Sequence, residues 1–280
     1  MSDTTGLIAL VGAGRMGAAL AAGWLKKSRN RVEPERIVFI DPNLSDAARA
    51  LADAHGVRCE PALTPALARQ VSDIVIAVKP GMVTEVLAPL KDQLPEDALV
   101  VSIAAGVTLR TLGRALPGRP AVRAMPNTPG AIGKGVSVCA ANEAGDGPDE
   151  RGRTEMLLKP AGPVEWVDDE RLMDVVTAVS GSGPAYVFLF CEALAAAAEA
   201  EGLPRELAQR LAVHTVAGSG ALLTSGQGDA SELRRTVTSP GGTTQAGLDA
   251  LMGGSGLPGL VRNAVAAAAR RSRQLGSDSN

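Results

Sequence analysis

Three glycines near the start of the chain form the segment most suggestive of chemistry. Gly12, Gly14 and Gly17 make a G-x-G-x-x-G pattern directly after the apolar run Leu7–Val11, and helical sequence follows. In that context the first glycine permits a tight turn, the second lets backbone approach a pyrophosphate, and the third lets helix and strand pack closely. The alternative is a turn that only connects a strand to a helix. The pattern predicts a dinucleotide-binding loop made of Gly12, Ala13, Gly14, Arg15, Met16 and Gly17.

An acidic residue stands where an adenosine ribose would be recognised. Asp41 ends the second apolar run, Ile37–Ile40, and lies 24 residues beyond the last glycine of the loop. A carboxylate at this place accepts hydrogen bonds from the ribose 2′-hydroxyl and repels a 2′-phosphate, which favours NADH over NADPH as cofactor. Arg36 and Arg49 are close enough in sequence to weaken the preference for NADH. Asp41-Pro42 is also a helix-start signature, and Asp41 can both cap a helix and bind the ribose.

The carboxyl ends of the later predicted strands supply the rest of the expected cofactor site, because ligands of open α/β sheets lie outside these ends. Small residues and prolines there leave room for a flat ring and hold the loops rigid. Lys79 is a candidate general acid, although a solvated lysine at a strand end is the more ordinary interpretation. The predicted contacts are Ala77, Val78, Lys79, Pro80, Ala104, Ala105, Gly106 and Asn127.

A second candidate site lies in the carboxyl-terminal half, where Thr238–Thr244 places two adjacent glycines and several hydroxyls before a helical stretch. Backbone N–H groups at such a helix start form a nest for a small anion. We expect this nest and the Ser239 hydroxyl to hold a carboxylate, and Thr244 to hydrogen-bond another group of the same ligand. The alternative is an ordinary loop that caps a helix. The predicted substrate contacts are Ser239, Gly241, Gly242 and Thr243.

Candidate proton-transfer groups are scarce. The two histidines, His55 and His214, lie at the end of one predicted helix and inside another, and no Ser/His/Asp or Cys/His arrangement accompanies them. No cluster of metal ligands stands out either, so no metal is predicted. Dehydrogenation of an alcohol normally needs a general base, whereas hydride addition to a protonated C=N bond needs none. The sequence therefore favours imine reduction.

The residues before 168 alternate short apolar runs with helical patterns, which indicates a Rossmann-type, doubly wound parallel sheet of the α/β class. Two further runs, Gly135–Cys139 and Pro163–Val167, are expected as strands at one edge of the sheet. The other expected strands are Leu7–Val11, Ile37–Ile40, Ile74–Val78, Leu99–Ile103 and Ala121–Met125. The expected helices between them are Met16–Lys27, Leu44–His55, Gly81–Leu90 and Leu109–Leu116.

After Asp168 strand-like runs stop and alanine-rich amphipathic segments begin. The expected helices are Arg171–Val179, Pro184–Glu201, Pro204–Thr224, Ser231–Thr236, Thr243–Met252 and Leu257–Gln274. Glycines 202, 226 and 228 fall where helices should end. We therefore expect a dinucleotide-binding domain over residues 1–167, an all-α domain over 168–275 and a disordered tail over 276–280.

Composition argues against several other classes of function. The net charge is −2, from 28 basic and 30 acidic residues without a long basic run, so nucleic-acid binding is not expected. Aromatic residues make up only 2% of the chain, which argues against stacking platforms. The three cysteines are widely spaced, which argues against disulfides and fits a cytoplasmic protein. No signal peptide is expected, because Met1–Gly6 has no positive region before an apolar stretch. No membrane span is expected either, because Val175–Cys191 is interrupted by Ser-Gly-Ser-Gly-Pro.

Several segments together carry a family resemblance. They are Gly12–Gly17, Ala77–Pro80, Ala104–Val107, Asn127–Pro129, Ser180–Tyr186, Gly202–Arg205 and Ser239–Thr244. With them the sequence resembles the pyrroline-5-carboxylate reductases, and its Ser-Gly-Ser-Gly-Pro-Ala-Tyr and Ser-Pro-Gly-Gly segments are the most specific marks. The resemblance implies a nucleotide-binding domain followed by a helical dimerisation and substrate-binding domain. It also implies that helices of two chains interlace and that dimers gather into a ring-shaped decamer.

The same resemblance implies a reaction and the residues that serve it. NADH or NADPH would give a hydride to the C=N carbon of L-1-pyrroline-5-carboxylate, forming L-proline. Ser239 and the backbone at Gly242 and Thr243 would hold the substrate carboxylate, and Thr244 would hydrogen-bond the ring nitrogen as the catalytic residue. Two departures from the family pattern argue against a preference for NADPH. Asp41-Pro-Asn43 replaces the Ser, Asn or Arg of many members, and Pro61–Pro65 lacks an Asn found in many.

Two other functions remain open on the sequence alone. A β-hydroxyacid dehydrogenase or imine reductase also joins a Rossmann half to a helical half, but typically has a catalytic lysine or acid early in the helices. Here Met173–Cys191 has no lysine, and Asp174 is its only charged residue. A non-catalytic nucleotide-binding regulator would keep the glycine loop without the chemistry. The intact Ser239–Thr244 segment argues against that function.

Overall fold

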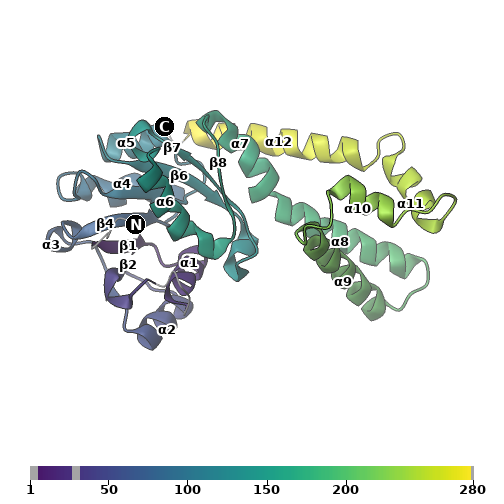
Figure 1. The fold of residues 1–280 in the computed structure, drawn as a ribbon, viewed down its shortest axis with the longest axis horizontal. Coiled ribbons are helices and arrows are strands. Elements are labelled where there is room, and N and C mark those ends of the chain that lie inside the picture. Colours follow the sequence, from purple (N-terminus) through teal and green to yellow (C-terminus); the bar gives the residue numbers. More distant parts are fainter. Residues whose placement is uncertain (1–5, 27–31, 279–280) are drawn as a thin grey trace. The chain divides into compact units, whose positions relative to one another are not determined.

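The computed structural model describes residues 6–26 and 32–278 of the chain. They form two compact units. Unit 1 comprises the chain up to Gly181 together with the residues from Ala268 onward, and unit 2 comprises Ser182–Ala267. Figure 1 shows the α/β architecture of unit 1 and the helices of unit 2. The fold class predicted from the sequence is confirmed.

Within the described residues, unit 1 is built on an eight-stranded sheet in the order β3-β2-β1-β4-β5-β6-β7-β8. Strands β1 to β6 run parallel, β7 is antiparallel to β6, and β8 is parallel to β7. The strand order reverses between β1 and β4, and ligands of such sheets bind outside the carboxyl ends at this point. The strands are β1 (Leu7–Val11), β2 (Ile37–Ile40), β3 (Arg58–Glu60), β4 (Val71–Ile76), β5 (Leu99–Ser102), β6 (Ala121–Pro126), β7 (Ser137–Ala141) and β8 (Val164–Trp166).

Both faces of the central part of the sheet are buried, so β1, β2, β4, β5 and β6 each contribute to two cores. On β1, Ile8 and Leu10 lie in a core with Trp24 of α1, while Ala9 and Val11 lie in a core with residues of α4 and α5. This alternation explains why the strand sequence is apolar at every position. The helices of unit 1 are α1 (Arg15–Leu25), α2 (Asp46–His55), α3 (Pro65–Ala68), α4 (Val83–Leu87), α5 (Leu109–Ala115), α6 (Pro148–Leu158) and α7 (Met173–Val176).

The strands and helices predicted before residue 168 are present close to their expected bounds, and the two extra strands lie at one edge of the sheet. The expected end of the first helix, Lys27, lies outside the described residues. Three elements were not predicted: β3, α3 and α6. Strand β3 carries Arg58 and Glu60 at the other edge of the sheet, so it has no apolar run. Helix α6 buries only Thr154, Leu157 and Leu158.

Unit 2 contains the helices predicted from the alanine-rich segments. They are α8 (Gly183–Ala200), α9 (Arg205–Leu223), α10 (Ala230–Thr236), α11 (Thr243–Met252) and the first part of α12 (Leu257–Asp278). Gly202, Gly226 and Gly228 have positive φ angles after α8 and α9, where glycine ends a helix without strain.

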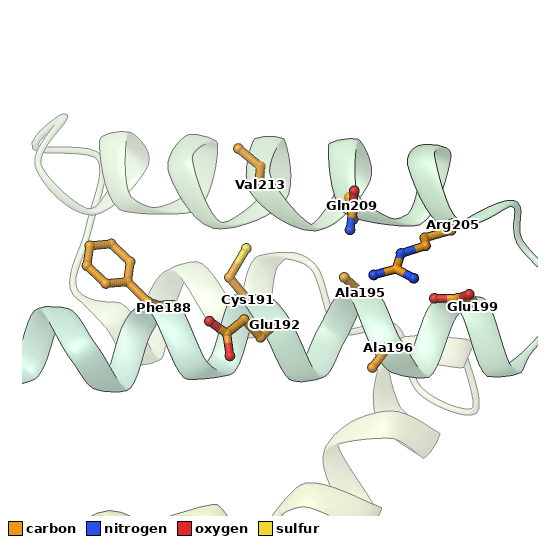
Figure 2. Close-up of a pocket in the computed structure, with 9 residues that line it drawn as sticks. All are labelled: Phe188, Cys191, Glu192, Ala195, Ala196, Glu199, Arg205, Gln209 and Val213. Carbon is orange, nitrogen blue, oxygen red and sulfur yellow. The ribbon is translucent and has the colours of Figure 1, made fainter.

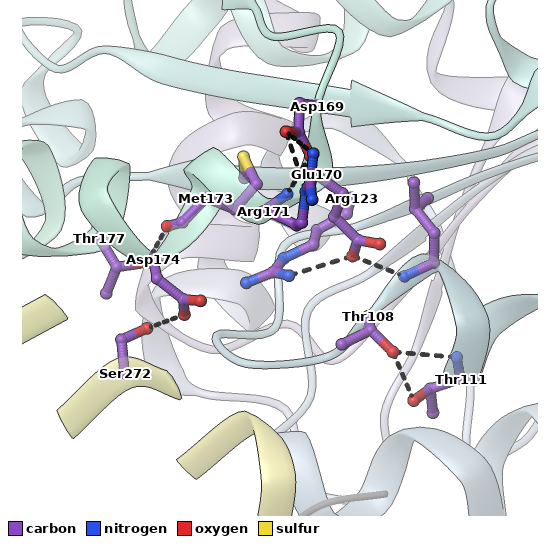
Figure 3. A network of polar contacts seen from close by, with 11 residues as sticks. Thr108, Thr111, Arg123, Asp169, Glu170, Arg171, Met173, Asp174, Thr177 and Ser272 are labelled. Carbon is purple, nitrogen blue, oxygen red and sulfur yellow. Dashed lines mark hydrogen bonds and ion pairs between the residues drawn. The ribbon is translucent and has the colours of Figure 1, made fainter. Parts of the chain in front are cut away.

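The boundary between the units differs from the expected boundary at residue 168. The turns η7 (Glu170–Leu172), α7 and η8 (Thr177–Gly181) belong to unit 1, and Met173 is fully buried there. Glu170 Oε1 accepts hydrogen bonds from Arg123 Nη1 (3.0 Å) and from the Leu109 N–H (2.8 Å). Asp174 accepts one from the hydroxyl of Ser272 on α12 (2.6 Å; Figure 3). These contacts hold both segments that lead to and from unit 2 onto unit 1.

Helix α12 is described as far as Asp278. The disordered tail expected over residues 276–280 stays a prediction. Residues 279 and 280 lie outside the described part of the chain.

Candidate functional site

A cavity of about 710 Å³ lies outside the carboxyl ends of β1, β2 and β4, at the point where the strand order reverses. It brings together six of the residues predicted to bind the cofactor: Gly12, Gly14, Asp41, Ala77, Val78 and Lys79. The other predicted contacts do not line it, namely Ala13, Arg15, Met16, Gly17, Pro80, Ala104, Ala105, Gly106 and Asn127.

The glycine loop has the geometry that the spacing predicts. Gly12 has φ +90°, and a Cβ there would lie 2.8 Å from the Ala77 carbonyl carbon and oxygen. A Cβ at Gly17 would lie 2.5 Å from the Gly12 carbonyl oxygen, so only glycine lets α1 pack this close. A Cβ at Gly14 would meet nothing within 4 Å. The loop is therefore tight where it touches the sheet and open at Gly14.

The start of α1 is free to receive an anion. Gly14 is its N-cap residue and no side chain caps it. The first N–H groups of a helix have no partner within the helix and carry the positive end of its dipole. The loop residues Arg15, Met16 and Gly17 contribute these groups, so the open surface at Gly14 and the α1 start fit a pyrophosphate.

Asp41 connects the two loops on either side of the cavity. Its Oδ2 accepts the N–H of Ala13 and its Oδ1 accepts the N–H of Asn43, each at 2.9 Å. It does not cap a helix, because the N-cap of α2 is Ser45. Arg36 does not reach it either: this residue precedes β2 and its Nε donates to the Gly6 carbonyl (3.2 Å), at the opposite end of the strand.

Several lining residues were not predicted from the sequence. They form the wall on the β3 and α4 side of the cavity: Pro61, Ala62, Leu63, Met82, Glu85, Val86, Pro89 and Leu90. The sequence signal for them is weak, because they lie in the irregular segment after β3 and in the short turns η2 (Pro80–Met82), α4 and η3 (Ala88–Leu90).

Asn127 holds a neighbouring loop in place. Its side-chain Oδ1 accepts the N–H of Val136 (3.0 Å), across the turn η4 (Thr128–Ile132). Gly135 is required beside it, because a Cβ there would lie 2.5 Å from that oxygen. Gly106 has φ +79° in the loop after β5. These residues fix the loops that follow β5 and β6.

The predicted substrate residues lie together in unit 2, at the start of α11. Gly241 has φ +70° and Gly242 is the N-cap residue, with no side chain capping the helix. The Gly242 N–H donates to the Ser239 carbonyl (3.0 Å), which closes the turn. Thr243 and Thr244 are exposed in the first helical turn. The junction therefore offers uncapped N–H groups with hydroxyls alongside.

Two cysteines have raised pKa values, which lowers the thiolate fraction of each at neutral pH. Burial raises the pKa of Cys139 to about 12, and burial followed by the nearby Asp53 carboxylate raises that of Cys59. Among the described residues, no group of three or more His, Cys, Asp or Glu side chains is placed to hold a metal ion.

The helices of unit 2 expose much apolar surface. A second cavity, of about 550 Å³, lies between α8 and α9 and is lined by residues such as Phe188, Cys191 and Val213 (Figure 2). The helical run Glu170–Ala200 is, by length and composition alone, apolar enough to cross a membrane: an 18-residue window within it has a mean hydropathy of 1.3, and 11% of that window is buried. A second protein chain covering these helices would account for the same apolar surface.

A Rossmann-type sheet with an open glycine loop at its switch point is the arrangement of the dinucleotide-binding proteins. Comparison with known proteins then gives the family. Residues 170–275 match the family described as "Pyrroline-5-carboxylate reductase dimerisation", and residues 7–106 match "NADP oxidoreductase coenzyme F420-dependent". The chain belongs to the pyrroline-5-carboxylate reductase family, whose members reduce a cyclic imine.

The similarity extends over the full length of known members. The chain is 39% identical to pyrroline-5-carboxylate reductase of Pisum sativum, over 96% of this chain and 95% of that protein. It is 38% identical to that of Pseudomonas aeruginosa, over 97% of both. A solved structure of the Coxiella burnetii reductase matches with a TM-score of 0.89 and 35% identity, covering 97% of this chain and 98% of the other. The Plasmodium falciparum structure with NADP bound has a TM-score of 0.77 at 29% identity, covering 98% and 99%.

Membership of this family accounts for the helical region. Its matched residues form the dimerisation region of the family, so the protein is a homo-oligomer with a small-molecule substrate.

Proposed function

We propose that this chain reduces the ring C=N bond of L-1-pyrroline-5-carboxylate to L-proline, the last step of proline biosynthesis, with NADH as the preferred hydride donor. One observation carries the proposal. A single chain of this family combines a dinucleotide loop that is open at Gly14 with an uncapped helix start at Gly242 that carries the Ser239 and Thr244 hydroxyls.

The start of α11 is assigned to the substrate carboxylate. The N–H groups of Thr243 and of the residues after it in the first turn, with the positive end of the helix dipole, favour an anion there. The Gly242 N–H is already bonded to the Ser239 carbonyl and holds the turn. The positive φ of Gly241 turns the backbone into this nest, and the Ser239 hydroxyl donates a further hydrogen bond. Small apolar or cationic ligands would gain nothing from these groups, so the site selects a carboxylate.

Thr244 is assigned the ring nitrogen and is the catalytic residue of the proposal. The substrate iminium already carries its proton, so no residue has to act as an acid or a base. The Thr244 hydroxyl oxygen accepts a hydrogen bond from the protonated nitrogen and thereby orients the C=N carbon. When bound, the reduced nicotinamide supplies the hydride to that carbon. The residues contribute proximity and orientation of two bound reactants.

The cavity of unit 1 is assigned to the cofactor. Gly12, Gly14 and the α1 start hold the pyrophosphate, and Ala77–Pro80, Ala104–Gly106 and Asn127 shape the path toward the nicotinamide. Asp41 is assigned the adenosine ribose. Each of its carboxylate oxygens accepts one N–H group and keeps a second lone pair for a ribose hydroxyl, but it has no donor for a 2′-phosphate. This charge arrangement favours NADH.

The assembly is assigned to the exposed faces of unit 2. Val187, Phe188 and Leu189 on α8 are 48%, 60% and 64% exposed, and water-exposed apolar side chains at this density favour a protein partner. We assign a dimer formed through these helices and, from the family resemblance, a decamer of five dimers in the cytoplasm. Sedimentation velocity distinguishes dimer from decamer by mass.

The proposal is tested by following the oxidation of NADH and NADPH with added pyrroline-5-carboxylate. Turnover with both cofactors and a higher kcat/KM for NADH are expected. If neither NADH nor NADPH supports turnover, the proposal is overturned. Thr244→Ala should lower kcat/KM by roughly 10- to 100-fold, because a hydrogen bond to a charged group contributes about 1.5–3 kcal/mol. Thr224→Ala is the control, since that exposed hydroxyl only donates to the Ala221 carbonyl in the same unit.

A further inference from the structure

The backbone of Ala13 is held at both its N–H and its carbonyl group by the loop between β2 and α2. Its N–H donates to Asp41 Oδ2 (2.9 Å), and its carbonyl oxygen accepts the hydroxyl of Ser45 (2.8 Å). Ala13 is fully buried and does not line the cavity. Both polar backbone groups of Ala13 therefore bond to the loop between β2 and α2, to residues that lie 28 and 32 positions further along the chain. The two bonds join this loop to the glycine loop.

The glycine loop needs such an external hold. Ala13 stands between Gly12, at φ +90°, and Gly14, and glycines have the largest conformational freedom of all residues. Neither glycine has a side chain that could fix the loop. The Gly12 N–H donates to the Ile40 carbonyl (2.9 Å), which anchors the loop to β2. The contacts of Ala13 extend this anchoring to the residue immediately before the open Gly14.

We propose that Ser45 is a positioning residue for cofactor binding, which fixes the glycine loop by donating its hydroxyl hydrogen to the Ala13 carbonyl. The inference rests on the proposed function insofar as the cavity binds a nicotinamide dinucleotide. Ser45 touches no part of the cofactor in this account. It acts by keeping the Gly14 backbone and the α1 start in the orientation that receives the pyrophosphate, and by linking that loop to the ribose-binding segment at Asp41.

A simpler role for Ser45 is to cap α2, and the structure shows that contact as well. Ser45 Oγ accepts the Ala48 N–H at 3.3 Å, which is longer than its 2.8 Å contact to Ala13. A hydroxyl has one hydrogen to donate and lone pairs that accept, so the two bonds coexist. Three substitutions separate them. Ser45→Ala removes both bonds, Ser45→Asp keeps an acceptor for the cap but has no hydrogen for Ala13, and Ser45→Thr keeps both.

The experiment is titration of the full-length protein with NADH, without the imine substrate, followed by nicotinamide fluorescence. Ser45→Ala should bind NADH about fivefold more weakly, the effect of losing one hydrogen bond of about 1 kcal/mol. Ser45→Asp should show a similar loss that persists in high salt, where the repulsion of an added charge is screened. Ser45→Thr should bind within about twofold of the unaltered protein. In steady-state assays, Ser45→Ala should raise the KM for NADH and leave kcat unchanged.

A helix-cap variant in the same unit serves as the control. Thr108 caps α5 by accepting the Thr111 N–H (3.1 Å) and does not line the cavity. Thr108→Ala should lower the Tm without weakening NADH binding. Equal weakening by Thr108→Ala and Ser45→Ala, or full affinity in Ser45→Asp at high salt, would overturn the inference and leave Ser45 as a cap only. If the unaltered protein binds neither NADH nor NADPH, the proposed function fails and this inference fails with it.

Discussion

The sharpest test of the cofactor site is a methyl group placed at Gly14. Gly14 has φ −71° and ψ −168°, which alanine adopts readily, and a Cβ there meets no protein atom within 4 Å. The substitution Gly14→Ala should therefore disturb the fold little. As an N-cap residue alanine is worse than glycine by about 0.5–1 kcal/mol, which for a domain of this size lowers the Tm by about 1–4 °C.

Binding should respond far more strongly than stability. The space that is open at Gly14 is where the pyrophosphate is expected to approach the backbone. An added methyl group would therefore clash with the bound pyrophosphate but not with any atom of the free protein. Overpacking of a close contact costs about 1–3 kcal/mol, which corresponds to NADH binding about 5- to 150-fold weaker. Fluorescence titration with NADH measures the affinity, and differential scanning calorimetry measures the Tm.

Two other glycines give the comparison. In Gly17→Ala the Cβ would lie 2.5 Å from the Gly12 carbonyl oxygen, so both stability and binding should fall. In Gly113→Ala, within α5, the Cβ meets nothing within 4 Å and helix propensity improves, so stability should rise by about 0.5–1 kcal/mol without a change in binding. NADH affinity unchanged in Gly14→Ala, with the fold intact, would refute the placement of the pyrophosphate at this loop.

Three further predictions concern specificity, stability and pH. Asp41→Ser should raise the ratio of NADPH to NADH kcat/KM while weakening both cofactors, because it also loses the carboxylate that accepts the Ala13 N–H; an unchanged ratio would place the ribose elsewhere. Arg153→Ala should lower the free energy of unfolding, measured in urea, by about 3 kcal/mol, because it leaves the buried carboxylate of Asp73 (1% exposed, 2.9 Å from Arg153 Nε) without its cation, with only the Ser72 hydroxyl as a partner among the described residues; Asp73→Ala/Arg153→Ala should recover part of the loss. The raised pKa of Cys139, about 12 against an ordinary 9.0, means that the folded chain retains a proton that the unfolded chain releases. The free energy of unfolding should therefore fall between these pH values, by up to 1.36 kcal/mol per pH unit, and Cys139→Ala should flatten this dependence.

The buried strands could be predicted because burial on both faces makes every position of the strand apolar. A strand covered by helices on both faces, such as Leu7–Val11, is apolar at each position and stands out in the sequence. Strand β3 could not be predicted in the same way. It is a three-residue edge strand that carries Arg58 and Glu60, and its existence depends on pairing with β2 rather than on its own composition.

The residues of the candidate site also differ in how far their roles depend on contacts between distant parts of the chain. The constraint at Gly17 is local, because a Cβ there would meet the Gly12 carbonyl oxygen, and the positive φ of Gly12 is a local property too. The spacing of the two glycines therefore indicated them, although the contact of Gly12 with Ala77 depends on the paired strands. Ser45 could not be predicted, because its contact with Ala13 joins residues 32 apart in sequence and exists only once β1 and β2 are paired. A serine before a helix indicates a cap, and nothing in the pattern indicates that its hydrogen is used elsewhere.

The division into units depended on tertiary contacts that no local pattern records. The change from strands to helices near residue 168 was visible in the sequence. The structure nevertheless keeps the first helical turns on unit 1, through the contacts of Glu170 with Arg123 and of Asp174 with Ser272. The turns α7 and η8, which lead to unit 2, are apolar like the helices of unit 2, so the sequence alone does not show to which unit they belong.

The central claim is that a hydride passes from the nicotinamide to the imine carbon of pyrroline-5-carboxylate. The most direct measurement is incubation of the protein with L-1-pyrroline-5-carboxylate and NADH carrying deuterium at the transferable position, followed by mass spectrometry and NMR of the product. The account predicts L-proline with one deuterium, on the ring carbon that was double-bonded to nitrogen, formed in equal amount to the NADH oxidised. NADH oxidation without proline, or proline without deuterium at that carbon, would contradict it.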